Sequence, residues 1–320
     1  MRPRAPGSGA RTAKRAGRAG GVRYGGRVIV VEGQVPTIDS RVHLTARETP
    51  YLRAPGVALL AAPATSLQAM AAFLEGFEPT LGFGRYLDDP TPLPAPEQLC
   101  KAAGQLCYAS FGPRRTWNAE AEKYIRQLKA AGHGSVLEHA NFSLLLYGVS
   151  RSLTHELVRH RAGTAFSQLS QRYVSGRVLR FVERPEYRDD PELHELFCQR
   201  IDAAATAYAR LTDLLLERQR EGRGMLAGTA RTDLRKKVQQ CARSLLPNET
   251  EAPLVMTANA RAWRHIIEMR ASPHAESEIR ELALRVYRVL RQAAPLLFGD
   301  YEEETLADGS IAVATPYPKV

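Results

Sequence analysis

Cationic side chains gather in three short segments that together could bind an anionic substrate. The first, residues 159–173, reads RHRAGTAFSQLSQRY and joins two arginines and a histidine to a polar turn. A guanidinium group binds phosphate or carboxylate oxygens through paired hydrogen bonds, so this segment suits a phosphate group. A solvated basic face that complements a helix dipole would explain the same residues equally well.

The other two segments lie further along the chain. Residues 242–248, ARSLLPN, place Arg243 before two leucines and a proline, a pattern that a surface arginine at a helix end explains more simply. Residues 259–270, NARAWRHIIEMR, place Arg261 and His265 four residues apart, on one face of a helix, with Arg270 at its exit. An amphipathic core helix with arginines extending to solvent is the alternative interpretation.

Metal chemistry is not expected. The segment HELVRH resembles a zinc-protease motif, but His155 and His160 are five residues apart, about 140° around a helix, and cannot share one metal ion. The cysteines form no CxxC pair and fit no zinc template, so we interpret them as free thiols in a reducing compartment. They are Cys100, Cys107, Cys198 and Cys241.

The net charge of +10 is concentrated near the N-terminus, because eight basic residues and no acidic residue precede Glu32. We predict a disordered basic tail over residues 1–27, with a transit peptide as the alternative. A nucleic-acid-binding protein is a distant hypothesis that rests on this tail, and no specific nucleic-acid partner is expected for the nearly neutral remainder. No long apolar run and no secretory signal occur, so we expect a cytoplasmic protein with no membrane contact.

Helices and strands must position the three segments. Apolar periodicity predicts helices over 66–82, 96–106, 118–131, 150–161, 192–219, 231–246, 262–270 and 277–294. Apolar runs predict strands over 28–32, 57–62, 140–149 and 254–258. Because strands and helices do not alternate strictly, the sequence favours an α+β fold with a mixed sheet and flanking helices. We expect a tail at 1–27, an N-terminal extension of uncertain structure at 28–95, and a catalytic domain at 96–320.

The motifs taken together resemble the flavin-dependent thymidylate synthase family. The matching segments are LCYASFG, GHGSVLEHANF, RHR with the later Ser-x-Arg-Tyr run, ARSLLPN, NARAWRHIIEMR and HAESEIRELA. They span roughly residues 97–295 in the order and near the spacing typical of that family. Ordered motifs of this kind are far more specific than any one of them.

The resemblance implies an α+β homotetramer with sites between subunits that methylates dUMP at C5. It implies bound FAD, with methylenetetrahydrofolate and NADPH as co-substrates, and Arg270 as the catalytic residue at the uracil edge. The FAD-binding residues it implies are His133, Ser135, Arg159, His160, Arg161, Gln168, Asn259, Ala260, Arg261 and His265. The nucleotide-binding residues it implies are Glu156, Arg159, Gln168, Ser170, Gln171, Arg172, Arg243 and Arg270.

Several residues depart from the family pattern. One extra residue stands between Arg161 and Ser170, in an expected turn over 162–168, and Glu156 stands where glutamine is frequent. His265 replaces a frequent asparagine. Because the first two departures fall beside the expected nucleotide, UMP remains an alternative substrate, as in a paralogue of nucleoside-antibiotic biosynthesis.

Overall fold

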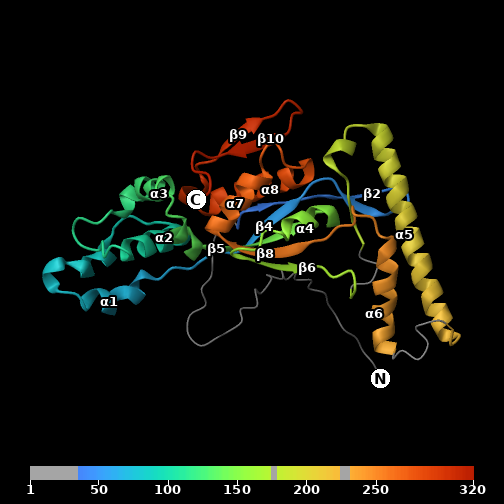
Figure 1. The fold of residues 1–320 in the computed structure, drawn as a ribbon, viewed down its shortest axis with the longest axis horizontal. Helices are drawn as coiled ribbons and strands as arrows, with labels where there is room; N and C mark the ends of the chain where they lie inside the picture. The colour runs from blue at the N-terminus through green and yellow to red at the C-terminus, as the bar shows by residue number, and fades with distance from the viewer. Residues whose placement is uncertain (1–34, 174–178, 224–230) are drawn as a thin grey trace, which may run out of the picture. The chain divides into compact units, whose positions relative to one another are not determined.

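A five-stranded antiparallel sheet forms the centre of the structure, a computed structural model that describes residues 35–173, 179–223 and 231–320. Its strand order is β1-β4-β5-β8-β6 (Figure 1). In that order, the strands are Thr37–Ile38, Gly56–Ala61, Asn141–Tyr147, Leu254–Asn259 and Thr164–Gln168. Strands β5 and β8 alternate buried and partly exposed residues, because successive side chains point to opposite faces of the sheet. On β5 the buried residues are Phe142, Leu144 and Leu146.

Two smaller sheets complete the strands of the described residues. One joins β2 (Val42–Leu44), β3 (Pro50–Leu52) and β7 (Phe181–Val182), and its β3–β7 pair is parallel. The other is a hairpin of β9 (Glu302–Thr305) and β10 (Ile311–Ala314). The α+β class is confirmed, although the central sheet is antiparallel throughout and the mixed pairing lies in the smaller sheet.

Helices α7 (Ala260–Arg270) and α8 (Ser277–Ala293) cover one face of the central sheet (Figure 1). The predicted apolar face of α8 is buried in the core through Ile279, Leu282, Val286 and Leu290. The other α-helices are α1 (Ala71–Glu75), α2 (Ala95–Leu106), α3 (Ala121–Ala130), α4 (Arg151–Leu157), α5 (Pro191–Arg220), α6 (Arg231–Ala242) and α9 (Pro295–Phe298). Short 3₁₀ helices are η1 (Leu67–Met70), η2 (Pro79–Leu81), η3 (Phe83–Asp88), η4 (Asn118–Glu120), η5 (Gly134–His139), η7 (Pro185–Tyr187) and η8 (Arg243–Leu245).

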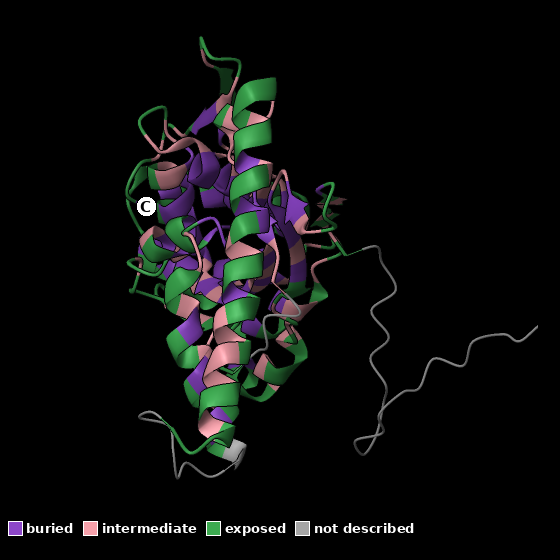
Figure 2. Ribbon diagram, turned by 90° about the vertical axis from the view of Figure 1, so that its right-hand side faces the viewer, coloured by how far each residue is buried: buried purple, intermediate pink, exposed green. Residues whose placement is uncertain are grey.

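Helix α5 is long and mostly exposed in the single chain. Figure 2 shows this helix facing the viewer, largely exposed or partly exposed, with few buried residues. Those residues are Phe197, Ile201, Asp202 and Tyr208, while Leu193 and Leu196 are exposed. None of the described helices is long and apolar enough to cross a membrane.

Three predicted elements differ in the structure. The helix expected over 150–161 ends at Leu157 with Val158 as its C-cap, and the following residues form a turn that leads to Gly163, which has a positive φ of 69°. The turn expected over 162–168 is mostly strand β6, which pairs with β8. The helix expected over 66–82 is a 3₁₀ turn followed by α1, which stops at Glu75, before Gly76 and Pro79.

The segment before residue 96 contributes to the central sheet. Strand β4 pairs with β5, with Val57 opposite Leu146, and β1 pairs with β4 in turn. A single compact unit runs from Val35 to Val320. Residues 35–61 are therefore part of the same folding unit as the expected catalytic domain. The tail expected at 1–27 and the strand expected at 28–32 lie outside the described residues.

Candidate active site

Two capped helices begin directly after the central strands and bring their C-terminal ends together. Ser150 caps α4, since its Oγ accepts a hydrogen bond from the N–H of Leu153 and donates to buried Glu278 of α8. Asn259 caps α7, since its Oδ1 accepts from the N–H of Ala262. Because β5 and β8 are antiparallel, the two helices start at opposite ends of the sheet.

The ends of α4 and α7 meet at Arg270. Its Nη1 donates to Oε2 of Glu156 at 2.7 Å, and its Nε donates to Nε2 of His160 at 2.9 Å. The Arg270 side chain is 22% exposed and that of Glu156 42% exposed. A guanidinium has five N–H donors, so Arg270 keeps donors for a ligand while two partners fix its orientation. We call Glu156, His160 and Arg270 the arginine cluster.

The His160 imidazole is neutral at neutral pH. Burial, the neighbouring Arg270 charge and His265 together lower its pKa to about 4. Its Nε2 accepts from Arg270, so the ring proton of the neutral form lies on Nδ1. The ring also lies edge-on to His265, with 5.7 Å between the ring centroids, which places this exposed residue beside the cluster.

Replacing Arg270 with alanine should raise the pKa of His160 toward its ordinary value, because one of the charges that lower it is removed. The measurement is a histidine ¹⁵N NMR titration of the full chain, with Arg288→Ala of α8 as the matched control that leaves the pKa of His160 unchanged.

In the unsubstituted protein, the free energy of unfolding should fall as the pH drops from 6.5 toward 4, because the His160 imidazole takes up a proton at a higher pH in the unfolded chain than in the folded chain. A His160 pKa near 6.5 in the unsubstituted protein contradicts this assignment.

A second group lies toward the N-terminal end of α7, where η5 packs against the helix. Arg261 Nη1 donates to Oε1 of Glu138 at 2.6 Å. Gly134 lies against the Arg261 side chain, because a Cβ at this position would stand 2.7 Å from Arg261 Nε. His133 and Ser135 flank this glycine and are exposed. From Arg261 to Arg270, α7 extends about 14 Å, a length that suits an elongated ligand.

Gly163 lets the chain between His160 and β6 approach α7 closely. Its carbonyl accepts from the N–H of Asn259 at 3.2 Å, and a Cβ would stand 2.5 Å from Asn259 Nδ2. Asn259 is therefore fixed by its capping bond and by this contact. Ala260 is buried beside it, and its N–H donates to the carbonyl of Ala140.

Gly163→Ala should lower the free energy of unfolding by about 2 kcal/mol or more, from left-handed backbone strain and the clash with Asn259. Gly309→Ala is the matched control, because Gly309 also has a positive φ but has open space around its Cα. Urea unfolding gives the free energy of unfolding of both variants. The loss in Gly309→Ala measures backbone strain alone, and any additional loss in Gly163→Ala measures the clash with Asn259. Equal losses of unfolding free energy in the two variants would show that the contact with Asn259 contributes nothing.

Arg159 and Arg161 are exposed on either side of His160. Neither side chain forms an ion pair or a hydrogen bond with a residue that the structure describes. Charged side chains at a turn that lack protein partners are available to bind anions. The two arginines and the arginine cluster therefore present cationic donors on adjoining parts of the chain.

The expected nucleotide-binding residues fall into separate places. Gln168, at the end of β6, donates from Nε2 to Oγ1 of Thr154 on α4, which keeps it near the arginine cluster. Ser170 Oγ accepts from the N–H of Arg172, a partly exposed residue whose buried Nε has no partner among the described residues. Gln171 is partly exposed between them.

Arg243 is the first residue of η8, directly after α6, and is partly exposed. Lys236 of α6 lies 4.8 Å from the ring centre of Tyr173, so α6 approaches the segment that follows β6. Across the described ranges, no hydrogen bond joins Arg172 or Arg243 to the arginine cluster. Within the described residues, the single chain thus joins Glu156, His160 and Arg270 by hydrogen bonds and does not tie the two arginines expected to bind phosphate to them.

Sequence reasoning assigned no role to Thr154, Glu138 or Gly163. Glu138 lies inside the GHGSVLEHANF motif, and its place in that motif could have indicated a role at the site. Thr154 is a buried helix residue whose partner comes from a distant strand, so no local pattern reveals it. Among residues 35–173, 179–223 and 231–320, no group of three or more histidine, cysteine or acidic residues could hold a metal ion.

The structure is an α+β fold with a cationic site, and a family comparison identifies the class of the protein. The sequence model of the family described as "Thymidylate synthase complementing protein" matches residues 90–296. The match covers more than half of the chain, so the protein belongs to this family. The family resemblance predicted from the motifs is thereby confirmed.

Individual relatives agree with this class. A flavin-dependent thymidylate synthase of Corynebacterium glutamicum is 43% identical over 228 residues, covering 71% of this chain and 88% of the relative. An enzyme of the same name from Corynebacterium diphtheriae is 43% identical and covers 69% of this chain and 85% of its own length. One from Mycolicibacterium vanbaalenii is 45% identical, with 68% and 84% covered.

Proposed function

We propose that this protein is a flavin-dependent methyltransferase that converts dUMP to dTMP. The observation that carries the proposal is the arginine cluster, in which Glu156 and neutral His160 orient the partly exposed Arg270 guanidinium. The family and the names of the relatives support the reaction. We further propose methylenetetrahydrofolate as the one-carbon donor, NADPH as the reductant, and a cytoplasmic location.

Arg270 supplies the electrostatic part of the reaction in this proposal. Carbon C5 of uracil is a weak nucleophile, and it gains electron density when the ring carries negative charge. A guanidinium at the N3 and O2 edge stabilises that charge by about 1.5–3 kcal/mol through charge-assisted hydrogen bonds. A cysteine that adds to C6 is the usual alternative, yet none of the four cysteines hydrogen-bonds to the cluster, and burial raises the pKa of Cys100 to about 12.

The residues along α7 fit FAD. Arg159 and Arg161, which have no partner among the described residues, offer guanidinium groups to a pyrophosphate, and Gly134 and Gly163 pack directly against Arg261 and Asn259 and so hold these side chains in place. His133, Ser135, His160, Gln168, Ala260 and His265 complete the proposed contacts. The bound flavin would supply the redox and one-carbon transfer chemistry. The protein side chains bind it, orient it and hold the uracil beside it.

We propose Glu156, Arg159, Gln168, Ser170, Gln171, Arg172, Arg243 and Arg270 as the nucleotide-binding residues. Because Arg172 and Arg243 are not joined to Arg270 within one chain, we propose that the complete site forms between subunits of a homotetramer. The exposed length of α5 and its exposed leucines agree with burial in such an assembly.

The test starts with the visible spectrum of the purified full chain. Flavin absorption bands, present on purification or after addition of FAD, are expected; a protein that binds no flavin contradicts the proposal. The flavoprotein is then given methylenetetrahydrofolate, NADPH and either dUMP or UMP, and the products are separated by mass. Methylation of dUMP supports dUMP as the substrate, whereas methylation of UMP but not of dUMP would show that UMP is the substrate instead.

A further inference from the structure

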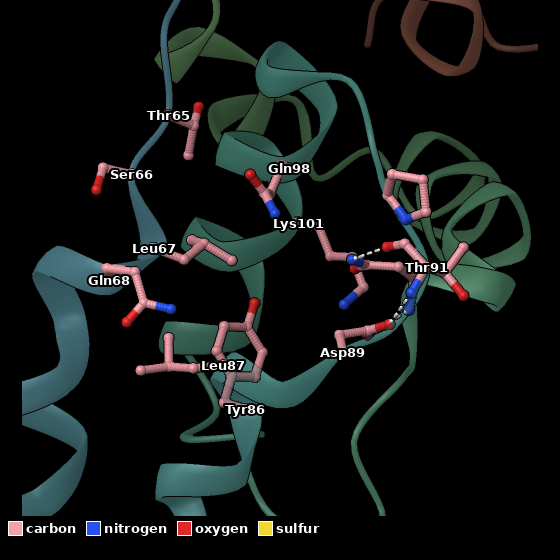
Figure 3. Close-up of a pocket in the computed structure, with 12 residues that line it drawn as sticks. Thr65, Ser66, Leu67, Gln68, Tyr86, Leu87, Asp89, Thr91, Gln98 and Lys101 are labelled. Atoms are coloured by element: carbon pink, nitrogen blue, oxygen red, sulfur yellow. Dashed lines mark hydrogen bonds between the residues drawn. The ribbon is translucent and has the colours of Figure 1, made fainter.

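A cavity of about 320 Å³ lies in the helical region that precedes and joins α2, away from the residues of the arginine cluster. Residues 65–68 form one wall, η3 and the loop after it form another, and α2 forms the floor (Figure 3). Residues 65–68 and Tyr86 precede the segment matched by the family. The cavity therefore depends in part on a region of this chain that lies outside the family match.

Lys101 of α2 lines the cavity with a buried ammonium that forms no ion pair with a described residue. The residue is only 2% exposed, and its Nζ donates to Oε1 of Gln105 at 3.1 Å. No carboxylate of the described residues forms an ion pair with it, and Tyr86 offers a ring face 5.5 Å away. An ammonium has three donors, so two remain for another partner. A buried charge without a paired anion is costly, which favours an anionic ligand at this position.

Near Lys101 the lining carries one negative group, whose charge partly offsets the lowering of the Lys101 pKa by burial (Figure 3). Asp89 lines the cavity and accepts from the N–H groups of Thr91 and Asn118, so the fold fixes its carboxylate. Each carboxylate oxygen keeps a free lone pair. Gln98 and Ser66 also line the space, and neither side chain has a hydrogen-bond partner in the described structure. The lining thus presents one cation, one anion and several neutral polar groups.

This arrangement selects among ligands by charge. A phosphate dianion suits Lys101 but is repelled by Asp89, and the arginine fork that favours phosphate is absent from the lining. A carboxylate alone satisfies Lys101 and leaves Asp89 unused. A small zwitterion satisfies both groups with opposite ends and adds no net charge to the buried site.

We propose that this cavity is a binding site for a small zwitterionic molecule of the α-amino acid type. Lys101 binds its carboxylate, Asp89 binds its ammonium, and the polar lining contacts its side chain. The site lies beyond the proposed methylation chemistry and uses none of its residues.

The experiment measures the Tm of the full-length flavoprotein with glycine, acetate or methylammonium chloride, at constant ionic strength. Glycine should raise the Tm saturably, by roughly 3 °C at ten times its Kd, and more than either single-charge probe at the same concentration. Lys101→Met should abolish this saturable rise, and Lys123→Met, on the exposed face of α3, should retain it. Asp89→Asn should fold and should remove the preference for glycine over acetate.

Two outcomes overturn the proposal. Equal Tm rises in the unsubstituted protein and Lys101→Met indicate general stabilisation by the solute, and the absence of a saturable rise means that no such site exists. Lys101→Met without ligand should also have a higher Tm than the unsubstituted protein, because it removes a buried charge that forms no ion pair with a described residue. A lower Tm would show that the ammonium serves the fold alone and would also overturn the proposal.

Discussion

Arg270→Ala should lower kcat for methylation by about 100- to 1,000-fold while the protein still binds flavin. The loss follows from the removal of the guanidinium that stabilises charge on the uracil ring, a type of donor whose deletion has effects of about this size. The substitution leaves unchanged the other residues along α7 that are proposed to bind flavin. Steady-state kinetics measure the rate, and the visible spectrum measures the bound flavin.

Two companion variants sharpen this result. Arg270→Lys keeps a positive charge but cannot donate to Glu156 and His160 through a rigid fork, so it should recover only part of the activity. Arg288→Ala removes an arginine of α8 that pairs with Glu303, and should leave kcat unchanged. Full activity of Arg270→Ala would exclude the guanidinium from the reaction.

Asp300→Asn should lower the free energy of unfolding by about 3–5 kcal/mol, which corresponds to a fall in Tm of roughly 10 °C. Asp300 accepts hydrogen bonds from both Arg264, at 2.7 and 2.9 Å, and Lys129, at 2.6 Å. Arg264 is 2% exposed, and Lys129 is also buried. Loss of the shared carboxylate charge leaves two buried cations without a counterion.

The matched control is Asp308→Asn, since the Asp308 side chain is 61% exposed and its ion pair with Arg280 is screened by solvent and should contribute little to stability. Calorimetry of both variants gives the comparison. Burial alone would raise the pKa of Asp300, but Arg264 and Lys129 lower it to about 2. Its stabilisation should therefore be complete above pH 3.8 and disappear as the pH falls toward 2. Similar losses in both variants would contradict the role of the shared carboxylate.

The parts of the site that lie on regular helices could be predicted from the sequence. The spacing of Arg261 and His265 requires one helix face, and the structure confirms a helix that carries both and ends at Arg270. The core face of α8 follows from its apolar period of 3.6 residues in the same way. In each case the signal is local, so a single segment contains it.

Long-range partners could not be predicted. The contact between Glu156 and Arg270 joins distant segments, and each residue alone has an ordinary helical environment. Strand β6, TAFSQ, is an edge strand with mixed side chains and no fully buried residue, so it lacks the apolar alternation of a strand. The hairpin strand β9, EEET, is exposed throughout and also lacks that signal.

The order of the central sheet also determines how the chain can fold. Val57 of β4 pairs with Leu146 of β5, and Leu146 pairs in turn with Leu254 of β8. The middle of the sheet therefore has a high contact order, and two large loops must close before its strands gain their pairing energy. During synthesis, β4 and β5 leave the ribosome long before β8, so the apolar face of β5 stays exposed until most of the chain has been made. The same strand order that positions α4 and α7 over one sheet makes slow assembly and early association with chaperones the expected behaviour of the nascent protein.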